Sequence, residues 1–123
     1  MFFLKSKKNK YSNKKVTFNN IKFDSAGEMR RYSELRLLEK GGVIRDLVTQ
    51  PRFSLQESFK HNGKTERRID YVADFSYEKK VDGKWVSIVE DFKGYRTEIY
   101  KLKRKLFLYK FRDKFEFIES GSK

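Results

Sequence analysis

The chain has 123 residues, which is enough for one small domain with a single hydrophobic core and leaves no room for a second. Lys and Arg number 30 against 17 Asp and Glu, so the net charge is +13 and favours a polyanionic partner. No apolar run approaches the ~20 residues that span a bilayer, so we expect that partner to be nucleic acid and not a membrane. The absence of Cys excludes disulfides and thiolate metal sites, and it fits a reducing cytoplasm.

The chain begins with a basic segment. Residues 1–15 are rich in Lys, with Lys14 and Lys15 at their end, and predict a flexible arm. The arm is either a solvated tail or a segment that settles on phosphates when nucleic acid binds. Residues 16–123 are expected to form one domain, which opens with a short hairpin over residues 16–23.

Residues 25–40 predict the first helix. Ser25 and Glu28 have the spacing of a capping box, in which each satisfies a free backbone N–H of the first turn. An apolar stripe recurs at helical spacing, at Met29, Tyr32, Leu35 and Leu38. Gly41-Gly42 then ends the helix, as a left-handed cap would.

Three strands are expected next. The first lies within residues 44–56, where Pro51 indicates an edge strand or a strand that begins there. An Asn-Gly hairpin turn leads to the second strand, residues 66–77, in which apolar and polar side chains alternate. An Asp-Gly turn leads to the third, residues 85–93.

A second helix and a final strand complete the predicted order α-β-β-β-α-β. Residues 97–110 predict the helix, with Thr97 as its N-cap. Its apolar stripe is Ile99, Leu102, Leu106 and Tyr109. Residues 114–119 alternate apolar and polar side chains and predict a short strand.

Two Asp and one Lys are expected to converge at the ends of the second and third strands. Asp91 and Lys93 lie two residues apart, so they share one face of the third strand. If the two strands pair, Asp74 joins them. Hydrolysis of a phosphodiester needs a divalent cation, an activated water and positive charge against the phosphate. Mg²⁺, for which Mn²⁺ could substitute, binds oxygen ligands. We predict that Asp74, Asp91, the Phe92 carbonyl and Glu28 hold the metal, with Lys93 as the catalytic cation.

Each of these residues has a simpler interpretation. Asp91 and Lys93 could form a surface ion pair, and Asp74 could face solvent on a half-exposed strand. Glu28 could be a helix cap alone, although capping and metal binding are compatible. Glu90 is a second candidate ligand, but strand alternation points it away from Lys93.

The excess of positive charge predicts a surface that follows the phosphates of nucleic acid. Taken singly, each basic residue is more simply a solvated charge. The candidate DNA contacts are Lys14, Lys15, Arg30, Arg31, Arg67, Arg68, Tyr95, Arg96, Lys101, Arg104 and Lys105.

The chain resembles the PD-(D/E)XK nuclease superfamily in its Glu28, its Asp74 and its Asp91-x-Lys93 triplet, followed by a basic helix. More narrowly, it resembles a family of small phage-encoded proteins that are regarded as Holliday junction resolvases or related endonucleases. Four segments within residues 11–119 carry this resemblance: Lys22-Phe23-Asp24-Ser25, Leu47-Val48-Thr49-Gln50-Pro51, Tyr71-Val72-Ala73-Asp74-Phe75 and Val89-Glu90-Asp91-Phe92-Lys93-Gly94. Two departures are that Ala73 replaces the motif's proline and that Asp91 replaces the commoner Glu.

The resemblance implies an α+β (α/β) fold of the restriction-endonuclease type, with an αβββαβ core and a central mixed sheet flanked by helices. It assigns Asp74 and Asp91 as metal ligands, Lys93 as the catalytic lysine and Glu28 as the acid on the helix.

The resulting expectation is a Mg²⁺-dependent endonuclease that resolves DNA four-way junctions. Resolution needs two symmetric nicks, so we expect a homodimer. If the chain is phage-encoded, it would act in the cytoplasm of a bacterial host. One alternative is a nuclease on linear duplex DNA in a phage recombination or packaging system. The other is a basic nucleic-acid-binding module without catalysis.

Overall fold

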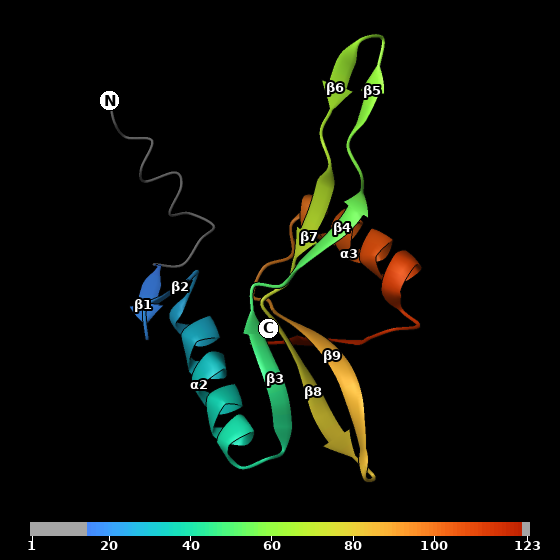
Figure 1. Cartoon of the computed structure of the whole chain (residues 1–123). Coiled ribbons are helices and arrows are strands. Elements are labelled where there is room, and N and C mark those ends of the chain that lie inside the picture. The colour runs from blue at the N-terminus through green and yellow to red at the C-terminus, as the bar shows by residue number, and fades with distance from the viewer. Residues whose placement is uncertain (1–14, 122–123) are drawn as a thin grey trace, which may run out of the picture.

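The computed structural model describes residues 15–121, which form an α+β fold with two helices and a mixed sheet (Figure 1). The expected fold class is therefore confirmed. Of the predicted N-terminal arm, only Lys15 lies within the described residues. The elements in chain order are β1 (Val16–Phe18), β2 (Ile21–Phe23), α2 (Ala26–Lys40), β3 (Ile44–Thr49), β4 (Arg52–Gln56), β5 (Phe59–His61), β6 (Lys64–Glu66), β7 (Ile69–Val72), β8 (Phe75–Val81), β9 (Lys84–Phe92), α3 (Glu98–Phe111) and β10 (Glu116–Ser120).

The main sheet has the strand order β10-β9-β8-β3 and separates two hydrophobic clusters. Its strands pair antiparallel except β9 and β10, which run parallel after the crossover through α3. Ile88 of β9 packs with α2, whereas the next residue, Val89, packs with α3. Because successive side chains of a strand point to opposite faces, the two helices cover opposite faces of the sheet.

The first helix forms as its sequence predicts. The Ser25 hydroxyl accepts a hydrogen bond from the Glu28 backbone N–H at 3.1 Å, and Gly42 takes the left-handed conformation after the last turn with φ of 81°. Tyr32 and Leu35 of the predicted stripe are buried against the sheet.

Two predicted strands are each broken in the middle, at Gln50-Pro51 and at Ala73-Asp74. The breaks lie opposite each other: the Gln50 N–H donates to the Asp74 carbonyl at 2.9 Å, and the Ala73 N–H donates to the Pro51 carbonyl at 3.0 Å. Pro51 has no N–H for a sheet ladder, and Gln50 has a positive φ of 54°. Both segments therefore leave the main sheet together, and β4 pairs with β7 in a separate ribbon.

The β4–β7 ribbon continues into the β5–β6 hairpin, which projects from the body of the molecule as an arm (Figure 1). Every residue from 56 to 69 is exposed. The two-residue turn at Asn62-Gly63 has φ of 52° and 77°, as expected for the hairpin turn that the Asn-Gly pair predicts.

The apolar stripe of the second helix is not the face that the helix buries. Ile99, Leu102, Leu106 and Tyr109 are all exposed, and α3 instead buries Tyr100 and Phe107. The reason is aromatic packing: the Phe107 ring lies 5.0 Å from that of Phe53 and 5.2 Å from that of Tyr71, both on the β4–β7 ribbon. Periodicity identified the helix but not the face that it buries.

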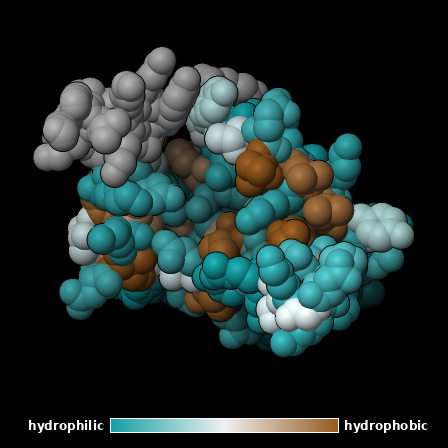
Figure 2. Space-filling model, turned by 90° about the horizontal axis from the view of Figure 1, so that it is seen from above, coloured by the Kyte–Doolittle hydropathy of each residue, from teal (hydrophilic) through white to brown (hydrophobic). Residues whose placement is uncertain are grey.

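No helix in residues 15–121 combines the length and apolar character needed to cross a lipid bilayer. The face seen from above is largely hydrophilic, with hydrophobic residues in separate patches (Figure 2).

Candidate functional site

Asp74 occupies the break between β7 and β8, where the chain passes from the ribbon into the main sheet. Its Oδ2 accepts a hydrogen bond of 2.7 Å from the Phe92 backbone N–H, at the end of β9. The break that interrupts the predicted strand therefore turns this carboxylate toward the end of the neighbouring strand. Asp74 lies within hydrogen-bonding reach of the carboxyl groups of Asp91 and Glu28.

Asp91 is 1% exposed and is held from two sides. Its Oδ2 accepts a hydrogen bond from the Tyr71 hydroxyl, and its Oδ1 lies 3.4 Å from Lys93 Nζ. Lys93 Nζ also sits 4.6 Å from the centre of the Tyr100 ring, a cation–π distance. The predicted convergence of Asp74, Asp91 and Lys93 is therefore present in the structure.

Glu28 caps the first helix, as its position in the sequence predicts, and it also lies beside the candidate site. Its Oε1 accepts a hydrogen bond of 3.3 Å from the Asp24 backbone N–H, so it caps the helix, while its carboxyl group also contacts Asp74. Gly27 makes this approach possible, since a Cβ there would lie 2.7 Å from the Phe92 ring. The first turn of α2 thus packs directly on the end of β9.

Burial raises the pKa values of all three carboxyl groups. Burial, with the negative charge of Glu28 adding to it, raises the pKa of Asp74 to about 6. Burial and the adjoining Asp74 raise the pKa of Asp91 to about 8, against the opposing charge of Lys93. Burial likewise raises the pKa of Glu28. Crowded carboxylates of this kind repel one another when ionised, and a bound cation would relieve that repulsion.

Asp91→Asn is expected to stabilise the metal-free protein at high pH. Folding raises the pKa of Asp91 from 3.8 to about 8, so the folded protein holds this proton more tightly than the unfolded chain. The free energy of unfolding therefore falls as the pH rises from 3.8 through about 8. The variant should therefore exceed the native protein in unfolding free energy by about 2 kcal/mol at pH 9, and by much less at pH 5.

Urea denaturation in EDTA at the two pH values measures this difference, with the exposed Asp113→Asn as the control for net charge. Equal stability of Asp91→Asn and the native protein at pH 9 would contradict the assigned crowding.

The donor atoms fit a hard divalent cation. Among the described residues, no group of three or more Asp, Glu, His or Cys side chains is arranged to hold a metal ion by itself. Mg²⁺, however, commonly uses one or two carboxylates, with water and substrate phosphate as its other ligands. Asp74 and Asp91 supply two, and the buried Asp91 Oδ1 accepts no hydrogen bond, although Lys93 Nζ lies 3.4 Å away. The predicted Phe92 carbonyl belongs to the same strand end, and Glu28 borders the site through Asp74.

Glu90, the second candidate ligand, is engaged elsewhere. It is fully buried on the α2 side of the sheet, where Arg31 donates to both of its oxygens at 2.6 and 3.0 Å. The hydroxyls of Tyr77 and Ser120 also donate to it, each at 2.6 Å. Its lone pairs are satisfied, so Glu90 ties α2, β8 and β10 together.

Two tyrosines of the site were not predicted from the sequence. Tyr71 bonds to Asp91, and Tyr100 packs under Lys93 while its hydroxyl donates to Glu119. The available signal for Tyr71 was an aromatic residue three positions before Asp74, but an unbroken strand would have placed the two on opposite faces.

A family comparison extends over nearly the whole chain. Residues 8–123 match the family model described as "Protein of unknown function (DUF1064)". The chain belongs to this family. No curated protein and no solved structure matches it.

The basic residues predicted to contact DNA are divided in this DUF1064 protein between paired and outward-facing side chains. Arg31 is bound to Glu90 and Glu34, and Arg96 and Arg104 both pair with Glu119. Those three arginines thus hold the fold around the site. Lys15, Arg68 and Lys101 form exposed ion pairs, which contribute little to stability. Lys14 lies outside the described residues.

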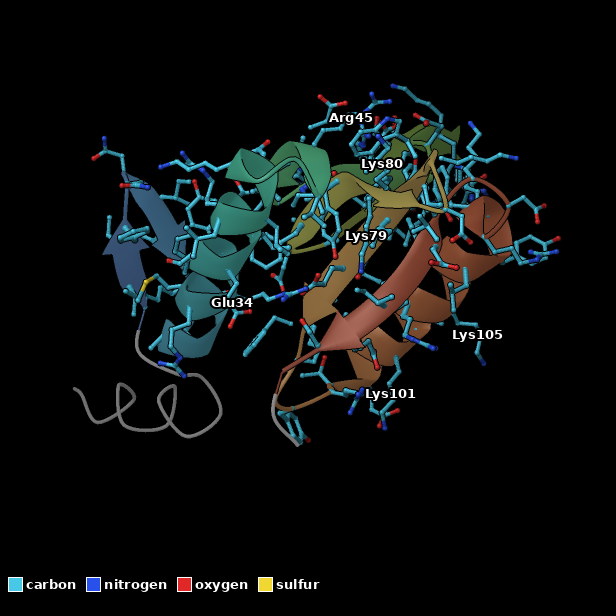
Figure 3. All side chains as sticks on the ribbon, turned by 90° about the horizontal axis from the view of Figure 1, so that it is seen from below. Glu34, Arg45, Lys79, Lys80, Lys101 and Lys105 are labelled. Carbon is cyan, nitrogen blue, oxygen red and sulfur yellow. The ribbon has the colours of Figure 1, made fainter. Side chains whose placement is uncertain are left out.

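Further exposed basic residues lie on several elements of the DUF1064 chain, some of them far from the site. Lys101 and Lys105 lie on α3, apart from Arg45, Lys79 and Lys80 on β3 and β8 (Figure 3). Arg67 is exposed at the base of the hairpin arm, and Tyr95 is 64% exposed in the loop after Lys93. Arg30 borders a pocket of about 430 Å³ beside the site, lined also by Gly27, Arg31, Glu34, Phe92, Ser120 and Gly121.

Proposed function

We propose that this chain is a metal-dependent endonuclease that hydrolyses phosphodiester bonds in DNA, and that its preferred substrate is a four-way junction. The observation that carries the proposal is the contact between the carboxyl groups of Glu28, Asp74 and Asp91 at one strand end, with Lys93 Nζ 3.4 Å from Asp91. Two buried acids, Glu28 and Asp91, and the partly buried Asp74 gather around one lysine, and a single positive charge does not balance three carboxylates.

The chain's own residues would orient and polarise the substrate. The Phe92 N–H fixes Asp74, and the Tyr71 hydroxyl fixes Asp91, so both carboxylates are preorganised for a cation. Asp74 and Asp91 would hold Mg²⁺ or Mn²⁺, which supplies Lewis acidity at the phosphate. Lys93, steadied by Tyr100, would place its positive charge against the phosphate as negative charge develops there.

The DNA would be held by the basic residues of the helix and ribbon that adjoin the site. The net charge is +13, and exposed Lys and Arg lie on α3 and on the arm. A two-stranded β-ribbon is narrow enough to enter the major groove, and the arm carries Lys60, Lys64 and Arg67. The arm would thus extend the contact with DNA beyond the cleaved bond.

The choice of a junction as substrate rests on the resemblance to small phage-encoded junction-resolving endonucleases within the PD-(D/E)XK superfamily. Two nicks of opposite strands about a two-fold axis would require a homodimer. The same chemistry also serves enzymes that cut linear duplexes, so the substrate needs its own test.

The deciding experiment compares cleavage of a synthetic four-way junction with cleavage of a linear duplex of the same sequence, in Mg²⁺ and in EDTA. We expect Mg²⁺-dependent nicks near the branch point and at least about tenfold slower cutting of the duplex, a difference of about 1.4 kcal/mol in activation free energy. Faster cleavage of the duplex would show that linear DNA, and not the junction, is the preferred substrate. Salt-sensitive binding of both DNAs without any cleavage would show that the protein is a binding module and not a nuclease.

A further inference from the structure

Two buried side-chain polar atoms within residues 15–121 have no hydrogen-bond partner, one on an acid and one on a base. The first is Asp91 Oδ1, at the candidate metal site. The second is Nε of Arg104, on α3. A buried polar atom without a partner is costly, and it calls for a water, an ion or a ligand. The unpaired acceptor suits a cation, and the unpaired donor suits an anion.

Arg104 is held in place although its Nε donates no hydrogen bond. Its guanidinium carbon lies 5.5 Å from the centre of the Phe117 ring, and its Nε lies 3.5 Å from Glu119 Oε2. Glu119 also accepts hydrogen bonds from Arg96 Nε and Nη2, at 3.2 and 2.8 Å, and from the Tyr100 hydroxyl. The hydrogen bonds from Arg96 lower the pKa of Glu119, and the one from Tyr100 adds to them, so Glu119 is ionised at neutral pH.

This arginine cluster, Arg96 and Arg104 around Glu119, has more donors than acceptors. Each guanidinium has five N–H groups, whereas the single carboxylate has about four lone-pair positions, three of which are already used. The side chains of Arg96 and Arg104 are 43% and 41% exposed, so solvent reaches both. Two arginines against one glutamate also leave a net charge of +1. The cluster therefore has the charge and the spare donors that an anion requires.

The arginine cluster lies beside the candidate site. Glu119 of β10 is directly opposite Asp91 of β9, and neighbouring strands are about 4.8 Å apart. The Lys93 N–H donates to the Ser120 carbonyl at 2.8 Å, and Lys93 Nζ contacts the Tyr100 ring. One tyrosine side chain thus separates Lys93 from the cluster. Because β10 is the edge strand, no further strand of the main sheet covers this side.

We propose that Arg96 and Arg104, set in place by Glu119, bind the DNA phosphate next to the one that is cleaved, and that Glu119 limits how tightly it is held. A strand whose scissile phosphate meets Lys93 presents its next phosphate close by. The planar fork of arginine matches a phosphate. Glu119 orients both forks, while its negative charge competes with the phosphate. The identity of the ligand rests on the proposed function, whereas the anion site itself rests on the contacts between α3 and β10.

Two neutral substitutions in the cluster should change DNA affinity in opposite directions. Arg104→Gln should weaken binding about tenfold and reduce the slope of log affinity against log salt by about 0.9, the value for one phosphate contact. Glu119→Gln keeps an oxygen that accepts from Arg96 but removes the competing charge, so it should strengthen binding about tenfold. Fluorescence anisotropy on a four-way junction in EDTA measures both effects and needs no cleavage.

Matched variants separate this site from net charge alone. Lys84→Gln removes a positive charge at the β8–β9 turn, seven residues before Asp91 on β9. Glu116→Gln removes a negative charge that points to the other face of the sheet, because it lies three residues from Glu119 on the same strand. Both should alter affinity less than about threefold, since salt screens distant charges. Arg104→Lys should recover most of the salt slope, because lysine contacts a phosphate as a point charge. Thermal melts show whether each variant is folded.

Cleavage separates binding from chemistry. At saturating protein, Arg104→Gln should cut at the native rate, and only the protein concentration at half-maximal rate should rise, about tenfold. Native affinity and salt slope for Arg104→Gln would overturn the proposal. Weaker binding by Glu119→Gln would overturn it too, because the cluster would then only support the fold, and so would a protein that binds no DNA. If both shifts occur but no DNA is cut, the phosphate site stands and the proposed nuclease activity does not.

Discussion

Asp74→Asn is expected to abolish Mg²⁺-dependent cleavage of a four-way junction while binding of the junction in EDTA persists. The amide keeps the hydrogen bond from the Phe92 N–H, at 2.7 Å in the native protein, but removes one of two charged metal ligands. Cleavage should fall about 1000-fold or more. Lys93→Ala should lower it about 100- to 1000-fold, because one preorganised positive charge is lost at the phosphate.

Single-turnover cleavage, alongside binding measured by fluorescence anisotropy in EDTA, separates chemistry from affinity. Asp113→Asn makes the same change in net charge at an exposed position and should cut normally. Thermal melts complete the comparison, since loss of a crowded carboxylate should leave Asp74→Asn at least as stable as the native protein. Undiminished cleavage by Asp74→Asn would show that neither this residue nor the proposed site takes part in the reaction.

Arg31→Ala should destabilise the fold by about 3–5 kcal/mol, the typical cost of leaving a buried charge without its partner. Glu90 is 0% exposed, and Arg31 makes both of its charged contacts, at 2.6 and 3.0 Å. The hydroxyls of Tyr77 and Ser120 remain but cannot neutralise the carboxylate. A charged Glu90 also lies next to Asp91, so the loss of this ion pair should disturb the candidate site as well.

Urea denaturation at pH 7 measures the effect, and the neighbouring exposed Arg30→Ala is the matched control, expected to be near neutral. Arginine holds the pKa of Glu90 below its usual value of 4.5, so the stability that this pair contributes is present above that pH and is lost as the pH falls through the folded pKa. The penalty of Arg31→Ala should therefore shrink at pH 3. An unchanged penalty there, or equal effects of the two arginine variants, would argue against an electrostatic role.

The sequence predicted most elements of the fold because their signals are local. Capping at Ser25 and the stripe around Leu35 predicted α2, and the Asn-Gly pair predicted the hairpin turn. It also placed Asp91 and Lys93 on one face of one strand, since a two-residue spacing on a strand has a single geometric outcome.

The sequence failed where several patterns were locally equivalent. On α3, one apolar row is exposed and another, with Tyr100 and Phe107, is buried. Both have helical spacing, and only the rings of Phe53 and Tyr71 on a distant ribbon decide between them. The contact between Tyr71 and Asp91 was not predicted for a similar reason. This contact depends on a break in the strand, and no local sequence pattern indicated that break.

By itself, the sequence determined the positive charge of this protein, the order of its helices and main strands, and the identities of its acids and lysine, because composition and short-range spacing are properties of the chain alone. The tertiary structure decided which of those acids meet. Asp74 reaches Asp91 only because the chain breaks at Ala73 opposite Pro51, and Glu28 reaches Asp74 only because Gly27 lets α2 approach Phe92. Contacts between residues distant in sequence depend on how separate elements pack, and that packing is fixed by the whole fold at once.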